Sequence, residues 1–507
     1  MGMSPDRQKD VARSLRRQVV PLARVEAGQG FADLQPLKAQ VGDARIVALG
    51  EATHGTREFF QCKHRLFEFL VVELGFTTFA IEAAWAESLA VNEYVLHGRG
   101  DPATALAGMY FWTCNTEEVL ALIGWMRRYN ADPAHETKAT FAGIDAQFTP
   151  VAVAAVLRYL AQVDPAYAAE VGPHLDPLRE VYLDYRTLPA LTVAELSGAV
   201  VELAARLQAE EGRYVARSSA DAWRLACRHA RVLCQADEQR RTGDDNKTRY
   251  TLRDRAMAES VGWLLETGGP RSKVVVWAHN AHVARDPAGL FDGTVETMGM
   301  CLARVYDSQL VVVGFAFGEG AFQAMVEESP GAFVLREVAV GPAPEGSLDA
   351  MLARLELPAF VVDLRRLDED AAAWFREPRI TREIGALYEG EEAMRQTIVP
   401  AARYDALVFV AQTTRARSSV AEVRRRLRPT PVAEPGPGAG REGLSVVVLN
   451  PSFECRQFGG AGDRGPSRAG SMGIDGSAWT GTALDAERNV VCAVASGRGE
   501  MPRLRSE

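Results

Sequence analysis

Five acidic and imidazole side chains follow three segments that are typical of buried strands. Glu51 and His54 lie in the turn GEATHG after the apolar run IVAL, Glu82 ends TTFAIE, and His279 and His282 lie in WAHNAH after KVVVW. Open α/β sheets bind their ligands at the carboxyl ends of parallel strands, where such turns meet. We therefore expect these five side chains to lie close together and to form the catalytic site.

This set of side chains suits hydrolysis by activated water. An imidazole that a carboxylate orients can take a proton from water and so create a nucleophile for an ester or amide carbonyl. Additional imidazoles or a cation can stabilise the oxyanion, and Lys63, nine residues after His54, is a candidate for that positive charge. The same Glu and His side chains could instead bind a divalent metal that activates water. The residue types alone leave both versions open.

The sequence lacks the motifs of several other enzyme classes. It has no G-x-S-x-G nucleophile elbow, no H-E-x-x-H helix and no G-x-x-x-x-G-K-[ST] phosphate loop, which disfavours a serine hydrolase, a zincin protease and a P-loop NTPase. Its seven cysteines are scattered and never spaced C-x-x-C. We interpret them as free thiols rather than as a disulfide framework or a zinc site.

Composition indicates a globular protein that acts on a small molecule. Of 507 residues, 47% are hydrophobic and 24% charged, and the net charge is −9, which argues against binding of nucleic acid. The N-terminus lacks a secretory signal, and no run approaches the ~18 apolar residues of a membrane span. We expect a cytoplasmic protein that does not bind a membrane. Nothing in the sequence indicates its oligomeric state.

Apolar segments and helical patterns alternate along most of the chain. The helical patterns include residues 58–75, which end at Gly75. This alternation predicts a three-layer α/β fold with a mostly parallel sheet flanked by helices. The predicted strands are residues 45–50, 77–82, 139–145, 273–279, 309–317, 359–364 and 405–411.

Three regions depart from this alternation. Residues 1–29 are expected to form an N-terminal helical extension of a hydrolase domain at 30–415. Residues from about 150 to 270 contain no convincing strand, which predicts a helical insertion that forms a cleft or lid, or else covers a face of the sheet. Residues 416–507 are rich in proline, glycine and arginine, and this tail is expected to be disordered.

The sequence resembles the erythromycin esterase family over about residues 30–415. The similarity lies in VGDARIVALGEATHGTREFFQCKHRLFEFLV, GFTTFAIEAAWAES, ATFAGIDAQ, RDRAMAESVGWLL, KVVVWAHNAHVAR and YDALVFVAQTT, in that order. The resemblance implies an α/β hydrolase, distinct from the serine-elbow fold, with a helical insertion over the sheet. It also implies that His54 is the general base that activates water, and that Glu51, Glu82, His279 and His282 line the site.

The resemblance also indicates candidate substrate-binding residues, one of which differs from some members of the family. The macrolide-resistance members have an arginine where this sequence has Lys63, and a lysine keeps the charge but loses the planar, bidentate donor. The segment from Met109 to Asn115 corresponds to a wall of the substrate cleft. We therefore name Lys63, Tyr110 and Trp112 as candidate substrate-binding residues.

The leading interpretation is a carboxylic-ester hydrolase that opens a (macro)lactone or a related ester, with a possible role in macrolide resistance. It needs no cofactor. One alternative is a metal-dependent hydrolase acting on a different substrate. The other is a non-catalytic protein that binds a small molecule. In the metal-dependent version the ligands would be Glu51, His54, Glu82, His279 and His282.

Overall fold

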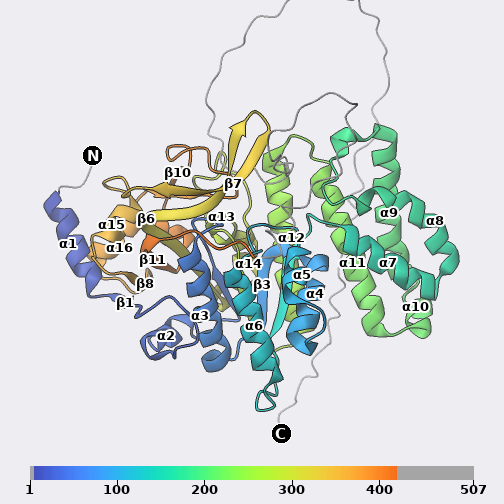
Figure 1. The fold of residues 1–507 in the computed structure, drawn as a ribbon, viewed down its shortest axis with the longest axis horizontal. Helices are drawn as coiled ribbons and strands as arrows, with labels where there is room; N and C mark the ends of the chain where they lie inside the picture. Colours follow the sequence, from blue (N-terminus) through green and yellow to red (C-terminus); the bar gives the residue numbers. More distant parts are fainter. Residues whose placement is uncertain (1–4, 420–507) are drawn as a thin grey trace, which may run out of the picture. The chain divides into compact units, whose positions relative to one another are not determined.

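The computed structural model describes residues 5–419, and within them a nine-stranded sheet forms the centre of the fold (Figure 1). Strand β7 (Ala332–Val340) pairs with the outer part of β6. The other eight strands are, in order across the sheet, β1 (Val19–Pro21), β8 (Ala359–Asp363), β11 (Ala406–Thr413), β6 (Leu310–Ser329), β2 (Ile46–Leu49), β5 (Val274–Trp277), β3 (Thr78–Ala84) and β4 (Thr140–Asp145).

The direction of the strands confirms the predicted fold class. All neighbours from β11 through β6, β2, β5 and β3 to β4 are parallel. Strands β1, β8 and β7 pair antiparallel with their neighbours. The sheet is therefore mostly parallel, and its parallel part contains the three strands that precede the predicted site residues.

All seven predicted strands are present, and the sequence analysis missed four others. Strand β7 was missed because most of its residues are partly or fully exposed, and Arg336 and Glu337 interrupt its apolar residues. Strands β9 (Arg379–Arg382) and β10 (Arg395–Ile398) form a separate two-stranded sheet and begin with arginine. Strand β1 has only three residues. Short or polar strands give too weak a pattern to distinguish them from loops.

Helices cover both faces of the sheet because its central strands are buried on both sides. Val47 and Leu49 pack in one layer with α3 (Arg57–Leu74), while Ile46 and Ala48 face the opposite layer with α12 (Asn246–Thr267). The first layer also contains α2 (Leu37–Val41), α4 (Trp85–His97), α5 (Pro102–Ala107) and α6 (Glu117–Ala131). The second also contains α1 (Pro5–Arg16), α13 (Asn280–Val283), α14 (Met298–Tyr306), α15 (Leu348–Ala353) and α16 (Glu369–Phe375).

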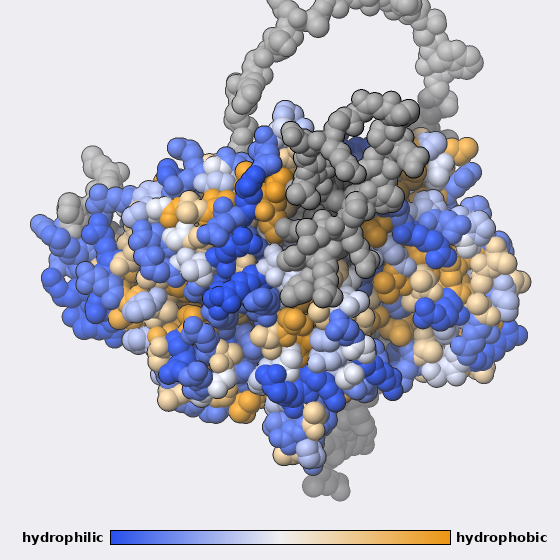
Figure 2. Space-filling view, viewed as in Figure 1, coloured by the Kyte–Doolittle hydropathy of each residue, from blue (hydrophilic) through white to orange (hydrophobic). Residues whose placement is uncertain are grey.

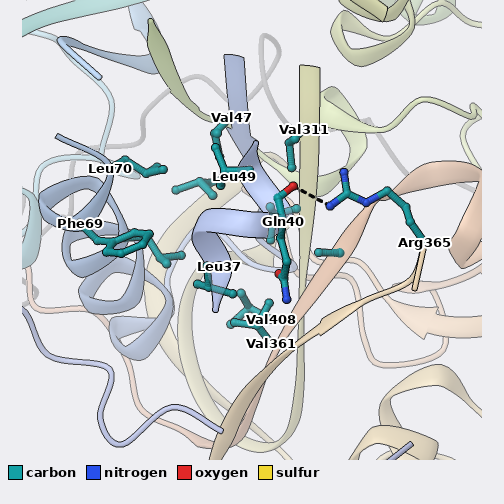
Figure 3. A pocket seen from close by; sticks show the side chains of 14 residues that line it. Leu37, Gln40, Val47, Leu49, Phe69, Leu70, Val311, Val361, Arg365 and Val408 are labelled. Carbon is teal, nitrogen blue, oxygen red and sulfur yellow. Dashed lines mark hydrogen bonds between the residues drawn. The ribbon is translucent and has the colours of Figure 1, made fainter. Parts of the chain in front are cut away.

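The predicted helix at 58–75 is α3, and Gly75 ends it in the left-handed conformation, with φ of 70°. One packing gap remains between α2, α3 and the sheet (Figure 3). This apolar cavity of about 40 Å³ is lined largely by valine and leucine side chains. At its edge, Arg365 Nη2 donates a hydrogen bond of 2.7 Å to the backbone oxygen of Gln40.

The region from 150 to 270 is helical, as the sequence predicted. Its helices are α7 (Pro150–Val163), α8 (Pro165–Leu175), α9 (Ala190–Ala209), α10 (Glu211–Arg217), α11 (Ala220–Arg240) and α12. Helices α7–α11 lie together beside α4 in Figure 1. They share a core with Trp85 and Ala146, which directly follow β3 and β4. Most of the insertion therefore packs beside the carboxyl ends of these two strands, while α12 returns to a face of the sheet.

The ends of the described region are held to the domain. After α1, strand β1 extends the sheet by pairing with β8. Ala416 and Ser419, which we assigned to the tail, pack against the domain: Ala416 N donates to Gly55 O at 2.8 Å, and Ser419 Oγ bonds to Asn115 Oδ1 at 2.6 Å. The rest of the predicted disordered tail lies outside the described residues, and the division of the chain at residues 29 and 415 stays a prediction.

Candidate active site

The two glycines of the GEATHG turn each lie against an oxygen atom that leaves no room for a Cβ. A Cβ at Gly50 would lie 2.2 Å from Asn280 Oδ1, and one at Gly55 would lie 2.0 Å from the backbone oxygen of Gln323. Only glycine leaves room for such approaches. The turn therefore packs tightly against β6 and α13, and this packing fixes Glu51 and His54 at the carboxyl end of β2.

Glu51 orients His54 through one oxygen. Glu51 Oε1 lies 2.7 Å from His54 Nδ1, so in the neutral ring Nδ1 carries the proton and donates it to the carboxylate. No group among residues 5–419 hydrogen-bonds to Nε2 on the other side of the ring. His54 is 7% exposed, whereas Glu51 is buried. The arrangement leaves the lone pair of Nε2 available to accept a proton.

Lys63 lies behind Glu51, on the far side from His54. Its Nζ donates to Glu51 Oε2 at 2.6 Å and lies 4.4 Å from the centre of the Trp277 ring, and Trp277 Nε1 donates to the same oxygen at 2.8 Å. Burial lowers the pKa of Lys63 to about 8, although the charge of Glu51 opposes this shift. Because Lys63 is completely buried, this geometry favours a role in holding Glu51 over the substrate contact that we expected.

Glu82, at the carboxyl side of the sheet, is an ionised member of the site. Its Oε1 accepts a hydrogen bond from Arg253 Nη2 at 2.8 Å and lies 3.2 Å from His282 Nε2, and its Oε2 accepts from the backbone N of His279 at 2.9 Å. Burial raises the pKa of Glu82, but the positive charges of His282 and Arg253 outweigh it and hold the pKa well below its ordinary value.

His282 is a buried cation that supports Glu82. Its Nδ1 lies 2.7 Å from Asp254 Oδ1, and its ring stacks on Tyr250 with 5.1 Å between ring centres. Burial would lower the pKa of His282, but the negative charges of Asp254 and Glu82 outweigh it and raise the pKa to about 9. His282 Nδ1 is therefore paired with Asp254, and Nε2 lies between Glu82 Oε1 and Arg253 Nη1, 3.0 Å away, so the direct contact with a substrate carbonyl that we expected is not favoured.

His279 is a buried, neutral neighbour of His54. Its Nδ1 accepts a hydrogen bond from the backbone N of Ala281 at 3.2 Å, which places the ring proton on Nε2. The centres of the His279 and His54 rings are 4.9 Å apart. Burial and the nearby charge of His54 lower the pKa of His279 well below its ordinary value, although Glu82 opposes this shift.

The structure thus brings all five predicted residues together at the carboxyl ends of β2, β3 and β5. His54 and Glu82 are the most exposed of the five, at 7% and 9%, whereas the other three lie deeper. Groups that contact a substrate or water directly are therefore best sought in His54 and Glu82. The buried members set the orientation and the charge of these two.

Three further members of the site escaped the sequence analysis. Arg253 joins Glu82 to Asp145, since its Nε and Nη2 lie 2.8 and 2.7 Å from Asp145 Oδ2. Asp254 holds His282 and also accepts from the backbone N of Met298 at 2.7 Å. Arg253 and Asp254 begin the segment RDRAMAES, and Asp145 ends the predicted strand ATFAGID. These segments carried the family resemblance, but a charged pair on a helix ordinarily indicates only a solvated face.

Tyr110 and Trp112 stay predictions as substrate-binding residues. Tyr110 has a left-handed backbone, with φ of 65°, and its ring packs 5.5 Å from that of Phe148. Trp112 is buried in a cluster with Met325, Ala386 and Leu387. Phe333 and Leu335 of β7 pack against this cluster, and Figure 2 shows a hydrophobic surface patch beside the β6–β7 hairpin.

The Glu and His side chains do not fit the metal-ligand set of the alternative interpretation. Glu51 is paired with Lys63, and Glu82 and His282 are paired with each other and with further charged groups. Over the described part of the chain, no group of three or more His, Cys, Asp and Glu side chains is placed to hold a metal ion.

The fold and the site define an α/β protein in which a carboxylate-oriented imidazole, the arrangement of a general base, lies at the carboxyl edge of the sheet. The chain belongs to the erythromycin esterase family, whose model matches residues 71–413. This match begins after the GEATHG turn, so the turn is an independent part of the resemblance. Family membership supports hydrolysis of an ester at the level of the family.

Known relatives agree with this assignment. Erythromycin esterase type II from Escherichia coli is 26% identical over 69% of this chain and 88% of its own length. A crystal structure of a succinoglycan biosynthesis protein is 27% identical, with a TM-score of 0.72 over 82% of this chain and 100% of that chain. A mutant of the erythromycin esterase EreC in its open conformation shares the fold at 16% identity, with a TM-score of 0.62 over 78% of this chain and 96% of that chain.

Two cavities within residues 5–419 lie away from the five site residues. One is the apolar gap under α2, and the other is a cleft of about 440 Å³ between α3 and α6, lined by His64, Glu68 and Arg128 among others. Neither is lined by any of the five predicted catalytic residues. None of the helices within residues 5–419 has the length and apolar character of a membrane span.

Proposed function

We propose that this protein hydrolyses a carboxylic ester, either a (macro)lactone or a related ester, with water that His54 activates. The observation that carries the proposal is the bond between Glu51 and His54 Nδ1, which directs the opposite nitrogen, Nε2, away from the carboxylate. Family membership supports the ester as the bond that is broken.

In the proposed reaction, His54 Nε2 takes a proton from water while the water oxygen attacks the ester carbonyl. The tetrahedral intermediate then collapses, the bond to the alcohol oxygen breaks, and the protonated Nε2 returns the proton to the leaving alkoxide. Glu51 stabilises the imidazolium that forms in between. Glu82 keeps acceptor capacity at Oε2, which receives one backbone N–H, and we assign it the role of orienting the attacking water.

Replacement of the base tests this proposal. His54→Ala should lower kcat/KM by about 10²- to 10⁴-fold, the usual contribution of a general base, while the protein stays folded. The matched control is His97→Ala, which removes an exposed histidine at the end of α4 and should leave activity unchanged. The assay incubates the purified protein with a panel of macrolides and simple aryl esters and identifies the products by mass spectrometry. A folded His54→Ala variant with full activity would contradict the proposal.

The same assay separates the alternatives. Products that are one water heavier than the substrate show hydrolysis, whereas tight binding without any mass change would instead show a binding protein. Loss of activity with a chelator, followed by recovery with added metal, would replace the His54 mechanism with a metal-dependent one. Turnover of aryl esters but not of macrolides would keep the reaction and remove the proposed role in macrolide resistance.

A further inference from the structure

A segment distant in sequence, residues 382–384, lies against the GEATHG turn. The backbone N of Ile384 donates to the oxygen of Ala52 at 2.7 Å, and Ile384 forms a parallel bridge with Thr53. The preceding residue, Glu383, is almost fully buried, with 1% of its surface exposed. The segment therefore places a buried carboxyl group beside the residues that position His54.

The two oxygens of Glu383 have different surroundings. Oε1 accepts from Tyr404 Oη at 3.3 Å, from Arg403 Nη1 at 3.4 Å and from Asn280 Nδ2 at 3.4 Å. Oε2 is buried, has no hydrogen-bond partner among residues 5–419, and lies 3.8 Å from His279 Nε2. At 3.8 Å this is a packing contact rather than a hydrogen bond, because His279 Nε2 carries the proton of the neutral ring.

Asn280 connects Glu383 to the rest of the site. Its backbone N donates to the oxygen of Glu51 at 2.9 Å, and its side chain bonds to both the N and the O of Phe315 on β6, at 3.0 and 2.8 Å. The side chain of Glu383 thus contacts a residue that fixes the GEATHG turn as well as the ring of His279. Through these contacts, a change at Glu383 would alter the position of His54.

Burial favours the neutral form of Glu383. Burial raises the pKa of Glu383 to about 7, the positive charge of Arg403 on α17 (Pro400–Arg403) opposes this shift, and the negative charge of Asp349 on α15 reinforces it. A neutral Glu383 does not favour a charged His279. This matters because a charged ring 4.9 Å from His54 would repel the proton that His54 must accept.

We propose that Glu383 is a positioning residue for the hydrolysis, and that it supports Asn280 and packs beside His279, which together fix the GEATHG turn and the place of His54. The inference rests on the proposed function of His54. It extends that function to a residue with no recognisable sequence motif, about 330 positions further along the chain.

Two substitutions at this position test the proposal. Glu383→Ala should lower kcat by about 10- to 100-fold with little change in KM, because the base is misplaced while substrate binding is kept. Glu383→Gln preserves the volume and the uncharged state, and should retain at least about a third of the wild-type kcat at pH 6, since a neutral polar group replaces a neutral acid. Glu389→Ala, in the same region but exposed, is the matched control and should not change kcat.

A pH profile distinguishes positioning from a purely structural role. Wild-type Glu383 ionises above pH 7 and glutamine cannot, so the ratio of kcat in Glu383→Gln to that in the wild type should change between pH 6 and pH 8.5. Arg403, Tyr404, Asp349 and His279 face the carboxyl group and are unchanged in both proteins. A constant ratio, or equal losses of kcat in both variants, would overturn the proposal.

Two outcomes separate this inference from the proposed function. If His54→Ala is inactive and Glu383→Ala has wild-type kcat, only the inference about Glu383 fails. If His54→Ala is fully active, the proposed function fails first. If Glu383→Ala does not fold, Tyr404→Phe removes one of the three donors to Oε1 and should lower kcat several-fold. Unchanged kcat in that variant would count against the role of Glu383.

Discussion

At the scale of single residues, Lys63 connects the buried charges of the site to its pH range. Its ammonium is held by Glu51 and has a pKa of about 8. Above that pH, Glu51 loses its cationic partner, and we expect kcat to fall between pH 8 and pH 9.5. Lys63→Arg keeps the positive charge over this range, so its kcat should stay level there. Steady-state kinetics over that pH range measures both proteins.

The control for this prediction is Lys9→Arg, an exchange on an exposed part of α1. It should reproduce the wild-type profile. Lys63→Met provides the opposite test, because it leaves Glu51 buried without its cation, which costs about 3 to 5 kcal/mol of stability when a buried pair loses one partner. A Lys63→Met variant with wild-type stability and kcat would show that Lys63 does not support Glu51.

Residue patterns predicted that the five Glu and His side chains would lie close together, but not how each of them is paired. Glu51, His54 and Glu82 were recognisable because they end or follow apolar strands. Their partners were not, since Arg253 is 171 positions from Glu82 and lies on a helix. Glu383 had no sequence signal at all, because its place depends on the contact of Ile384 with Ala52. Burial and pairing, which decide the charges, exist only in the folded chain.

At the scale of elements, strands were predictable where both faces are buried. Strands β2 and β5 are buried at every position and therefore read as continuous apolar runs. Most residues of β7 are partly or fully exposed, and β9 and β10 each have only one apolar residue in four positions. Predictions from apolar runs therefore recover the buried strands, including β4 at one edge of the sheet, and miss the short or partly exposed ones.

The cavity between α2 and the sheet allows a test of packing at this scale. Ala406 on β11 lines the cavity, so Ala406→Val should fill part of it and raise the free energy of unfolding by about 0.5 to 1 kcal/mol. Val312→Ile is the control, because Val312 packs in the opposite layer. The added methylene there should lower stability by about 1 to 3 kcal/mol. Urea unfolding compares the two, and a destabilised Ala406→Val would show that the cavity cannot accept side-chain volume.

At the scale of the whole molecule, buried ionisable groups should make stability fall as pH rises from 6.5 to 8. The pKa of His282 is about 9 in the folded protein and ordinarily 6.5, so above pH 6.5 the folded state binds a proton that the unfolded state has released. The stabilisation is complete below pH 6.5 and is lost as pH rises through 9. Burial also raises the pKa of Glu87 and Glu383 to about 7, and both groups likewise make stability fall as pH rises toward 7.

Other ionisable groups have pKa shifts that make stability rise with pH, and they limit the pH range over which stability falls. Burial lowers the pKa of His229 to about 4 and that of His279 well below 6.5, which makes stability rise with pH below 6.5, and Lys63 acts in the same direction above pH 8. Between pH 6.5 and pH 8 the proton on His282 has the largest effect on stability, and one proton corresponds to a slope of about 1.4 kcal/mol per pH unit.

Urea unfolding at several pH values measures this slope. His282→Gln cannot bind the proton and should flatten the slope, whereas His97→Gln, at an exposed position, should not. A wild-type slope that survives in His282→Gln would show that the proton is bound elsewhere.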